Sequence, residues 1–270
     1  MPIDRARFGL SVGVVLCALA GVAPAEANGP SDPFGLSSNQ WQAGGFVYIM
    51  PNYEGGKGHS VIAFPFAAPV GLGDSGFVQI KGIDDIRFRL FQNSGFEFGP
   101  LVGYRFGRDE DDAGRLTGMG DVDGGLVAGA FAAYRAGPFA ASISYHHQAT
   151  GDETGGLVRF GLEHVHMMSP RVKITTSLGT NYATEDYMAS FFGVTAAQAA
   201  TSTLSQYDAS AGFKDVYAGI TANIDLTDRW SLMLMGRYAR LIGDAADSPV
   251  IETENQFYGG VGLSYKFSTR

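Results

Sequence analysis

The chain has 270 residues, a formal net charge of −8, 17% charged residues and 38 glycines. Its mean hydropathy of +0.02 is too low for a bundle of membrane helices, and after the N-terminal segment no apolar run reaches the roughly 18 residues that a spanning helix needs. The acidic balance and the lack of a basic run exclude nucleic acid as a partner.

Residues 1–27 have the form of a secretory signal peptide, which we expect to be cleaved on export. Arg5 and Arg7 precede an apolar stretch, and alanines with small-x-small spacing follow it at residues 23–27. Cys17, the only cysteine, lies in this segment, so the mature chain is expected to have no disulfide and no thiol chemistry. Residues 28–40 are rich in Gly, Pro, Ser and Asn and predict an extended periplasmic lead-in.

After the lead-in, segments of alternating apolar and polar residues recur between turn residues, as in antiparallel strands. The last segment, 256–267, has Phe257 and Phe267 near the two margins of its apolar face, with Gln256 and Lys266 on the polar face. Aromatic residues at both margins fit the two interfaces of a bilayer. We therefore predict an all-β fold for residues 41–270, a transmembrane antiparallel up-and-down β-barrel. Its twelve strands are expected at 41–50, 59–68, 76–81, 86–92, 96–106, 124–135, 139–147, 156–166, 171–182, 215–226, 229–240 and 256–267.

The lengths of the connections give a second indication of a membrane barrel, in which short turns face the periplasm and longer loops face outward. The expected turns are 69–75, 93–95, 136–138, 167–170 and 227–228, and the longest loops are 107–123, 148–155, 183–214 and 241–255. Long and short connections mostly alternate, although the connection at 82–85 is short for an outer loop. In the longest loop, Thr195 and Gln198 have the spacing of a capping box, and residues 191–200 predict a short helix at the barrel mouth.

Four histidines could in principle hold a metal ion. Alternation places His146 toward the lumen and His147 outward, near one end of the wall. His164 and His166 share an outward face near the other end. Because the two pairs lie at opposite ends, interfacial histidines are the better interpretation, and no metal site is expected.

An acidic cluster in the predicted loop 107–123 has two interpretations. Residues 109–112, with Asp121 and Asp123, carry the oxygen ligands that a divalent cation needs, but their spacing lacks the pattern of a calcium-binding loop. A solvated acidic loop is the better interpretation, and beside lipopolysaccharide it could share that lipid's bridging cations.

No catalytic constellation is present in the sequence. A Gly-x-Ser-x-Gly elbow is lacking, and no carboxylate pair or His/Ser set converges in the predicted strands. We expect no enzymatic activity and no cofactor.

The residues expected to line the lumen are mostly basic. Alternation along the strands places eight basic and three acidic residues on the inward face. The basic residues are Arg87, Arg89, Arg105, Arg135, Arg159, Lys173, Arg237 and Lys266, and the acidic residues are Glu97, Glu163 and Asp225. One interpretation is a passage or pocket that favours anions. The other is an interior braced by ion pairs and by an inserted loop, because a barrel of twelve strands is wide enough to admit one.

Several passages resemble the MltA-interacting protein/OmpV family of Gram-negative outer membranes, across essentially all of the mature chain. They are FFGVT at 191–195 with Gln198 and Ala199, GDAADSPV at 243–250, YKF at 265–267, YRFGRD at 104–109 and YEG at 53–55. The passage at 243–250 is the most specific of these. The tail at 268–270, beyond the usual terminal aromatic residue, departs from the family pattern.

The resemblance implies an outer-membrane protein surrounded by lipid and lipopolysaccharide. In some members it implies a scaffold that links a murein hydrolase, a lytic transglycosylase, to a murein synthase. We therefore expect a non-enzymatic scaffold or interaction protein of the cell envelope, whose periplasmic partner contacts residues 28–40 and the short turns. A channel for small anions and a surface-binding protein that uses its acidic outer loops are the alternatives.

Overall fold

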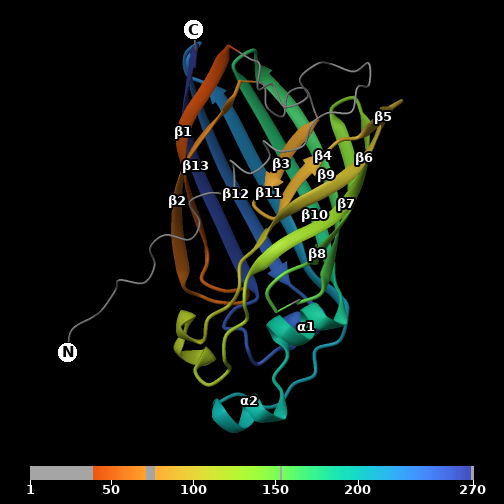
Figure 1. Cartoon of the computed structure of the whole chain (residues 1–270), viewed down its shortest axis with the longest axis vertical. Coiled ribbons are helices and arrows are strands. Elements are labelled where there is room, and N and C mark those ends of the chain that lie inside the picture. The colour runs from red at the N-terminus through yellow and green to blue at the C-terminus, as the bar shows by residue number, and fades with distance from the viewer. Residues whose placement is uncertain (1–38, 71–76, 153, 269–270) are drawn as a thin grey trace, which may run out of the picture.

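The computed structural model describes residues 39–70, 77–152 and 154–268 and shows one antiparallel sheet of thirteen strands (Figure 1). The predicted signal peptide and residues 28–38 of the lead-in lie outside these residues. None of the described helices is long and apolar enough to cross a membrane. The strands are β1 (Gln40–Pro51), β2 (His59–Pro69), β3 (Val78–Gly82), β4 (Asp85–Phe88), β5 (Phe91–Asn93), β6 (Phe96–Arg105), β7 (Gly125–Ala136), β8 (Phe139–Gln148), β9 (Gly156–Ser169), β10 (Val172–Ala183), β11 (Gly212–Asp225), β12 (Trp230–Leu241) and β13 (Asn255–Ser268).

Neighbouring strands in the sheet are mostly neighbours in sequence, and the last strand, β13, pairs with the first, β1. This up-and-down order confirms the predicted barrel topology. On β6 the burial pattern alternates: Phe96 and Phe98 are exposed by 58% and 52%, whereas Glu97 and Leu101 are exposed by only 2% and 1%. The same alternation recurs along the other long strands, so an apolar belt covers the outside of the curled sheet.

The sheet has a seam, where we expected a wall closed on itself. β2 and β3 are its two ends, and no backbone pairing joins them among the described residues. β2 contains Pro65, which a strand paired on one edge tolerates. β3 and β4 contact the inner face of β9 through Lys81 and through Asp84 in the turn between them. This hairpin therefore leans into the barrel instead of meeting β2.

The predicted strand at 86–92 is divided into β4 and β5 by a β-bulge. Arg87 is paired with Leu101 of β6, whereas Phe91 is paired with Phe98, so β4 and β5 contain one more residue than the facing part of β6. The extra residue changes the direction of the chain, so β5 stays on the wall while β4 leads toward the interior.

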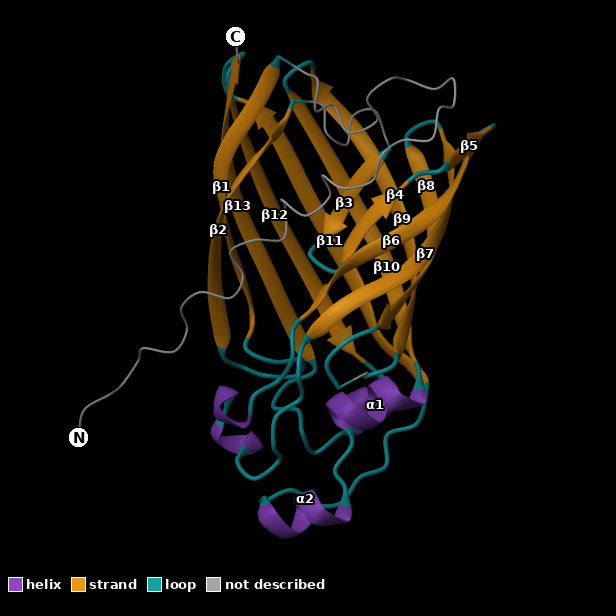
Figure 2. Cartoon of the chain, in the orientation of Figure 1, coloured by secondary structure: helices purple, strands orange, loops and turns teal. Residues whose placement is uncertain are grey.

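Every described helix lies beyond one end of the sheet, which we call the loop end; the other is the turn end (Figure 2). The helices are η1 (Glu110–Asp112), η2 (Gly114–Leu116), α1 (Glu185–Phe192), α2 (Ala196–Thr201) and α3 (Gly243–Asp247). The capping box of Thr195 and Gln198 is confirmed at the start of α2. Residues 191 and 192, however, end a separate helix, α1, because Gly193 is extended and interrupts the helical path.

Candidate functional site: the capped end and the interior of the barrel

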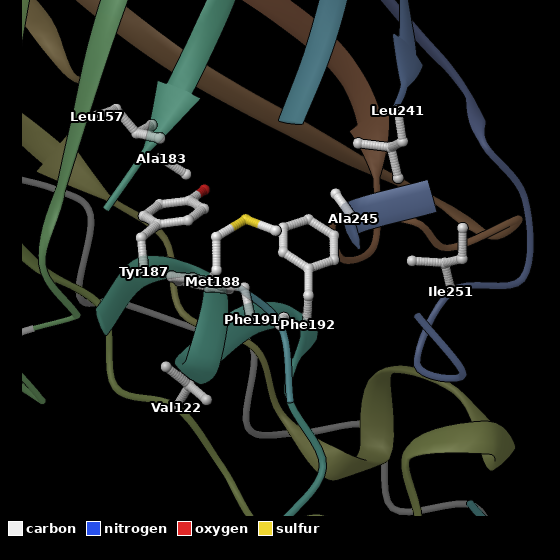
Figure 3. Close-up of a cluster of buried hydrophobic side chains, with 11 residues drawn as sticks. Val122, Leu157, Ala183, Tyr187, Met188, Phe191, Phe192, Leu241, Ala245 and Ile251 are labelled. Carbon is white, nitrogen blue, oxygen red and sulfur yellow. The ribbon is translucent and has the colours of Figure 1, made fainter. Parts of the chain in front are cut away.

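Four segments, 52–58, 106–124, 184–211 and 242–254, pack together over the loop end and form what we call the cap. Its apolar centre is the inner face of α1, where Met188 and Phe192 are 1% and 0% exposed (Figure 3). Leu241 and Ala245 approach this face from the end of β12 and from α3. Residues from distant parts of the sequence thus share one small hydrophobic core above the barrel.

Hydrogen bonds join the same segments. The Ser248 hydroxyl donates to the Phe192 carbonyl oxygen over 2.6 Å, and the Tyr53 hydroxyl donates to the Val250 carbonyl oxygen over 3.2 Å. The Gly55 carbonyl oxygen accepts from the backbone N–H groups of residues 252 and 253. Gly55 has φ +96°, and a Cβ there would overlap Ile251, so this contact requires glycine.

A buried polar network lies directly beneath α1. The Lys214 ammonium pairs with Asp215 at 2.7 Å and with Glu54, and each of the three side chains is at most 19% exposed. The Tyr187 hydroxyl donates to Glu54 over 2.8 Å, and the Asn181 amide donates to both oxygens of Asp215. Burial and the Glu54 carboxylate raise the pKa of Tyr187 above its ordinary value. One buried cation therefore holds two carboxylates and ties the cap to the barrel wall.

The turn between β3 and β4 forms a second network inside the wall. The Lys81 ammonium lies 2.7 Å from Glu163, and Asp84 pairs with Arg159. The Asp84 carbonyl oxygen is 3.1 Å from Nδ1 of His146, a residue with no exposed surface. These contacts join residues 62 to 82 positions apart in sequence and fix the hairpin across the inner face of β8 and β9.

Along β8 and β10, burial of the inward side chains increases from the turn end to the loop end. On β8, Ser144, His146 and Gln148 are buried, while inward residues nearer the turn end are half-buried. On β10, Asn181 is buried and Lys173, at the turn end, is exposed. On these two strands the interior is thus filled beneath the cap and more accessible toward the turns, whereas on β6 the inward Glu97 is buried at the turn end.

A third group lies between these ends. The guanidinium carbon of Arg237 on β12 is 3.9 Å from the ring centroid of Tyr217 and 5.7 Å from that of Tyr258. Tyr48 stacks on Tyr258 with ring centroids 6.4 Å apart. All four side chains are half-buried and come from four adjacent strands, β1, β13, β12 and β11.

The sequence profile of the family described as MltA-interacting protein MipA matches residues 43–267, which covers every long strand and the cap. The chain belongs to the MipA family. Omp26La, an outer membrane protein of Vibrio anguillarum, is 26% identical over 206 residues, which cover 75% of this chain and 79% of that protein. The outer membrane protein OmpV of Vibrio cholerae is 26% identical over 194 residues, which cover 68% and 72%. This MipA family chain is therefore an outer-membrane protein, and its turn end faces the periplasm.

Solved outer-membrane proteins are similar in fold alone. The channel DcaP of Acinetobacter baumannii has a TM-score of 0.38 and 10% identity and covers 84% of this chain and 96% of its own. The NanC porin has a TM-score of 0.39 and 10% identity and covers 84% and 100%.

Four of the five passages that carried the resemblance to the MipA family meet in the cap, whereas YKF at 265–267 lies at the turn end of β13. Glu54 bonds to Tyr187 of α1, and Phe192 accepts from Ser248 of the 243–250 passage. Arg108, which is 2% exposed, donates through Nη1 to the Phe191 carbonyl oxygen. The shared place of these four passages gives a physical reason for their part of the family pattern, because they are joined by buried contacts in the cap.

The candidate lining residues fall into three groups. Arg87, Arg159 and Lys266 pair with Asp85, Asp84 and Asp225, and both Arg89 and Arg135 pair with Glu97. Arg105 donates to neutral oxygen atoms of Thr154, Gly155 and His146. For Lys173 and Arg237, the described residues supply no carboxylate partner. Sequence reasoning missed Asp84 and Asp85, because they stand in or beside a turn expected at the barrel rim.

The remaining candidate residues have structural contacts. His147 lies 3.3 Å from the Tyr145 hydroxyl, and His164 packs on Phe139. In the acidic loop, Asp112 accepts from the Asp109 backbone and Asp121 from the Glu110 backbone. Within the described ranges, no three His, Cys, Asp or Glu residues are grouped to hold a metal ion.

Tyr53 gives a test of the cap through pH. It is 4% exposed, and burial, followed by the charge of Glu252, raises its pKa to about 12. A folded-state pKa above the unfolded value of about 10 stabilises the folded chain fully below pH 10, and this contribution is lost as the pH rises toward 12. Between pH 10 and pH 12, the unfolding free energy of Tyr53→Phe should fall by about 2 kcal/mol less than that of the wild type. The measurement is urea unfolding in lipid vesicles. An unchanged pH profile for Tyr53→Phe would contradict the assignment.

Proposed function

We propose that this MipA family chain is a non-enzymatic interaction protein of the cell envelope that presents its periplasmic end to a partner. The main support is the cap: buried side chains fill the outer mouth, whereas on β8 and β10 the inward residues become more accessible toward the periplasmic turns. This arrangement favours binding from the periplasm over free diffusion between the two sides. The family description makes a murein enzyme of the MltA type the first partner to test.

The periplasmic end offers a small charged surface for such a contact. Arg171 and Asp228 form a pair at 2.9 Å with side chains 56% and 92% exposed. Beside it, a surface hollow of about 440 Å³ is lined by Thr227, Asp228, Arg229, Trp230 and Tyr265. An exposed ion pair contributes little to folding, so it can be altered without disturbing the barrel.

The proposal is tested by measuring binding of a purified MltA-type lytic transglycosylase to the full chain in nanodiscs. We expect saturable binding that is weakened about tenfold by Arg171→Glu, because a charge at the contact is reversed. Arg240→Glu, in an exposed pair at the opposite end, is the matched control and should bind as the wild type does. Deletion of residues 28–38 should weaken binding further.

Equal binding by all variants would contradict a periplasmic docking end. Absence of binding, combined with a steady single-channel conductance of the wild type in planar bilayers, would favour the anion-selective passage instead. That second candidate is supported by Lys173 and Arg237, two inward bases for which the described residues supply no carboxylate partner.

A further inference from the structure

We propose that Arg237, Tyr217, Tyr258 and Tyr48 form a binding site inside the barrel for a small organic carboxylate with a flat ring. The site is distinct from the periplasmic docking end, and its occupancy requires neither a partner nor transport.

Among the described residues, the charge of Arg237 has no carboxylate counterion. No carboxylate lies within 4.0 Å of this guanidinium among the described residues, and its Nε is buried without a hydrogen-bond partner. Most other inward bases of the same wall are paired, as Arg87 is with Asp85 at 2.7 Å and Lys266 with Asp225 at 3.3 Å. A cation held in a half-buried interior without an anion is stabilised by one that arrives from solution.

The aromatic neighbours orient this cation and leave polar groups unused. Tyr217 stacks under the guanidinium at 3.9 Å, which fixes its plane. The hydroxyls of Tyr217, Tyr258 and Tyr48 make no hydrogen bond to any other side chain or backbone group that the structure describes. The guanidinium of Arg237 thus lies against the rings of Tyr217 and Tyr258, and neighbouring phenols supply unused donors of the kind that recognise an oxyanion.

Glycines on the inner wall make room for the rings. A Cβ at Gly179 would overlap the Tyr217 ring, and Cβ atoms at Gly260 and Gly262 would crowd the ring of Phe46. The ring centroid of Phe46 also lies 6.2 Å from that of Tyr48 and 5.5 Å from that of Phe64, so the aromatic surface extends toward β2. A flat, ring-shaped body fits beside such a wall, because aromatic surfaces stack on planar groups. The ligand is therefore assigned as a carboxylate joined to a ring.

The test uses benzoate as the probe and benzamide as its uncharged counterpart, with the full chain in a neutral detergent and isothermal titration as the measurement. We expect saturable binding of benzoate and none of benzamide. Arg237→Met keeps the length of the side chain and should weaken benzoate binding at least about tenfold. Tyr217→Phe and Tyr258→Phe keep the rings and should each weaken it about threefold, the effect of one lost hydrogen bond.

Lys173→Met is the matched control, because Lys173 is an inward base without an ion pair among the described residues, placed at the turn end. It should bind benzoate as the wild type does, and heat-modifiable gel mobility should show that every variant is folded. The assignment is overturned if Arg237→Met binds benzoate with unchanged affinity or if benzamide binds equally well. It is also overturned if the wild type binds inorganic phosphate more tightly than benzoate, or binds neither.

Discussion

Replacing Lys214 by Met should destabilise the folded chain by about 3–5 kcal/mol, because it leaves the carboxylates of Glu54 and Asp215 buried without their cation. The Lys214 side chain is only 4% exposed, so water cannot replace its charge. Asp215 keeps the Asn181 amide as a donor and Glu54 keeps the Tyr187 hydroxyl, but neither group carries a positive charge. The measurement is equilibrium unfolding in urea with the protein in lipid vesicles.

Arg240→Met is the control for this variant. Its pair with Glu254 spans 2.5 Å, but the two side chains are 53% and 41% exposed, so the loss should stay below about 1 kcal/mol. The triple variant Lys214→Met, Glu54→Gln, Asp215→Asn removes the buried charges together and should recover most of the stability, since only the charge imbalance is costly. If Lys214→Met alone were as stable as the wild type, the network would not join cap and barrel.

The wall of the barrel could be predicted from the sequence because lipid imposes a period of two on every strand. Phe96 and Phe98 must face outward, so Glu97 must face inward, and the burial of these residues agrees. The bulge between β4 and β5 could not be predicted in this way. One additional residue is not visible in a short segment where apolar and polar residues do not alternate strictly. The seam was not predictable for a related reason. The hairpin of β3 and β4, which leans into the barrel, has the same mixture of apolar and polar residues as the strands that stay on the wall.

The interior was less predictable because its contacts join residues far apart in the sequence. Parity placed Arg159 inside, but nothing in the sequence paired it with Asp84, which lies 75 residues away. The count of inward bases therefore overstated the free charge of the wall. In the cap, the capping box of Thr195 was visible as a local pattern, whereas the contact between Phe192 and Ser248 depends on folding.

Replacing Phe192 by Ala should open the cap. The Phe192 side chain has no exposed surface and packs with Met188, Leu241 and Ala245 in the core above the barrel. Loss of a buried phenylalanine costs about 3–5 kcal/mol, because the cavity that remains is only partly refilled. The hydrogen bond from Ser248 to the Phe192 carbonyl oxygen belongs to the backbone and survives the change, so the effect reports side-chain packing alone.

The decisive measurement is limited proteolysis with trypsin, compared with heat-modifiable gel mobility. Each strand pairing of the wall is independent of Phe192, so the barrel should remain folded while the cap segments become cleavable, for example at Arg108, which is buried in the native state. Phe192→Leu should give an intermediate rate, because it preserves most of the volume, and Thr203→Ala, at an exposed cap position, should cleave as the wild type does. Cleavage of Phe192→Ala at the wild-type rate would show that the cap does not depend on this core. If the barrel unfolds together with the cap, the two form one cooperative unit, and the closed outer mouth is then a condition for the stability of the wall itself.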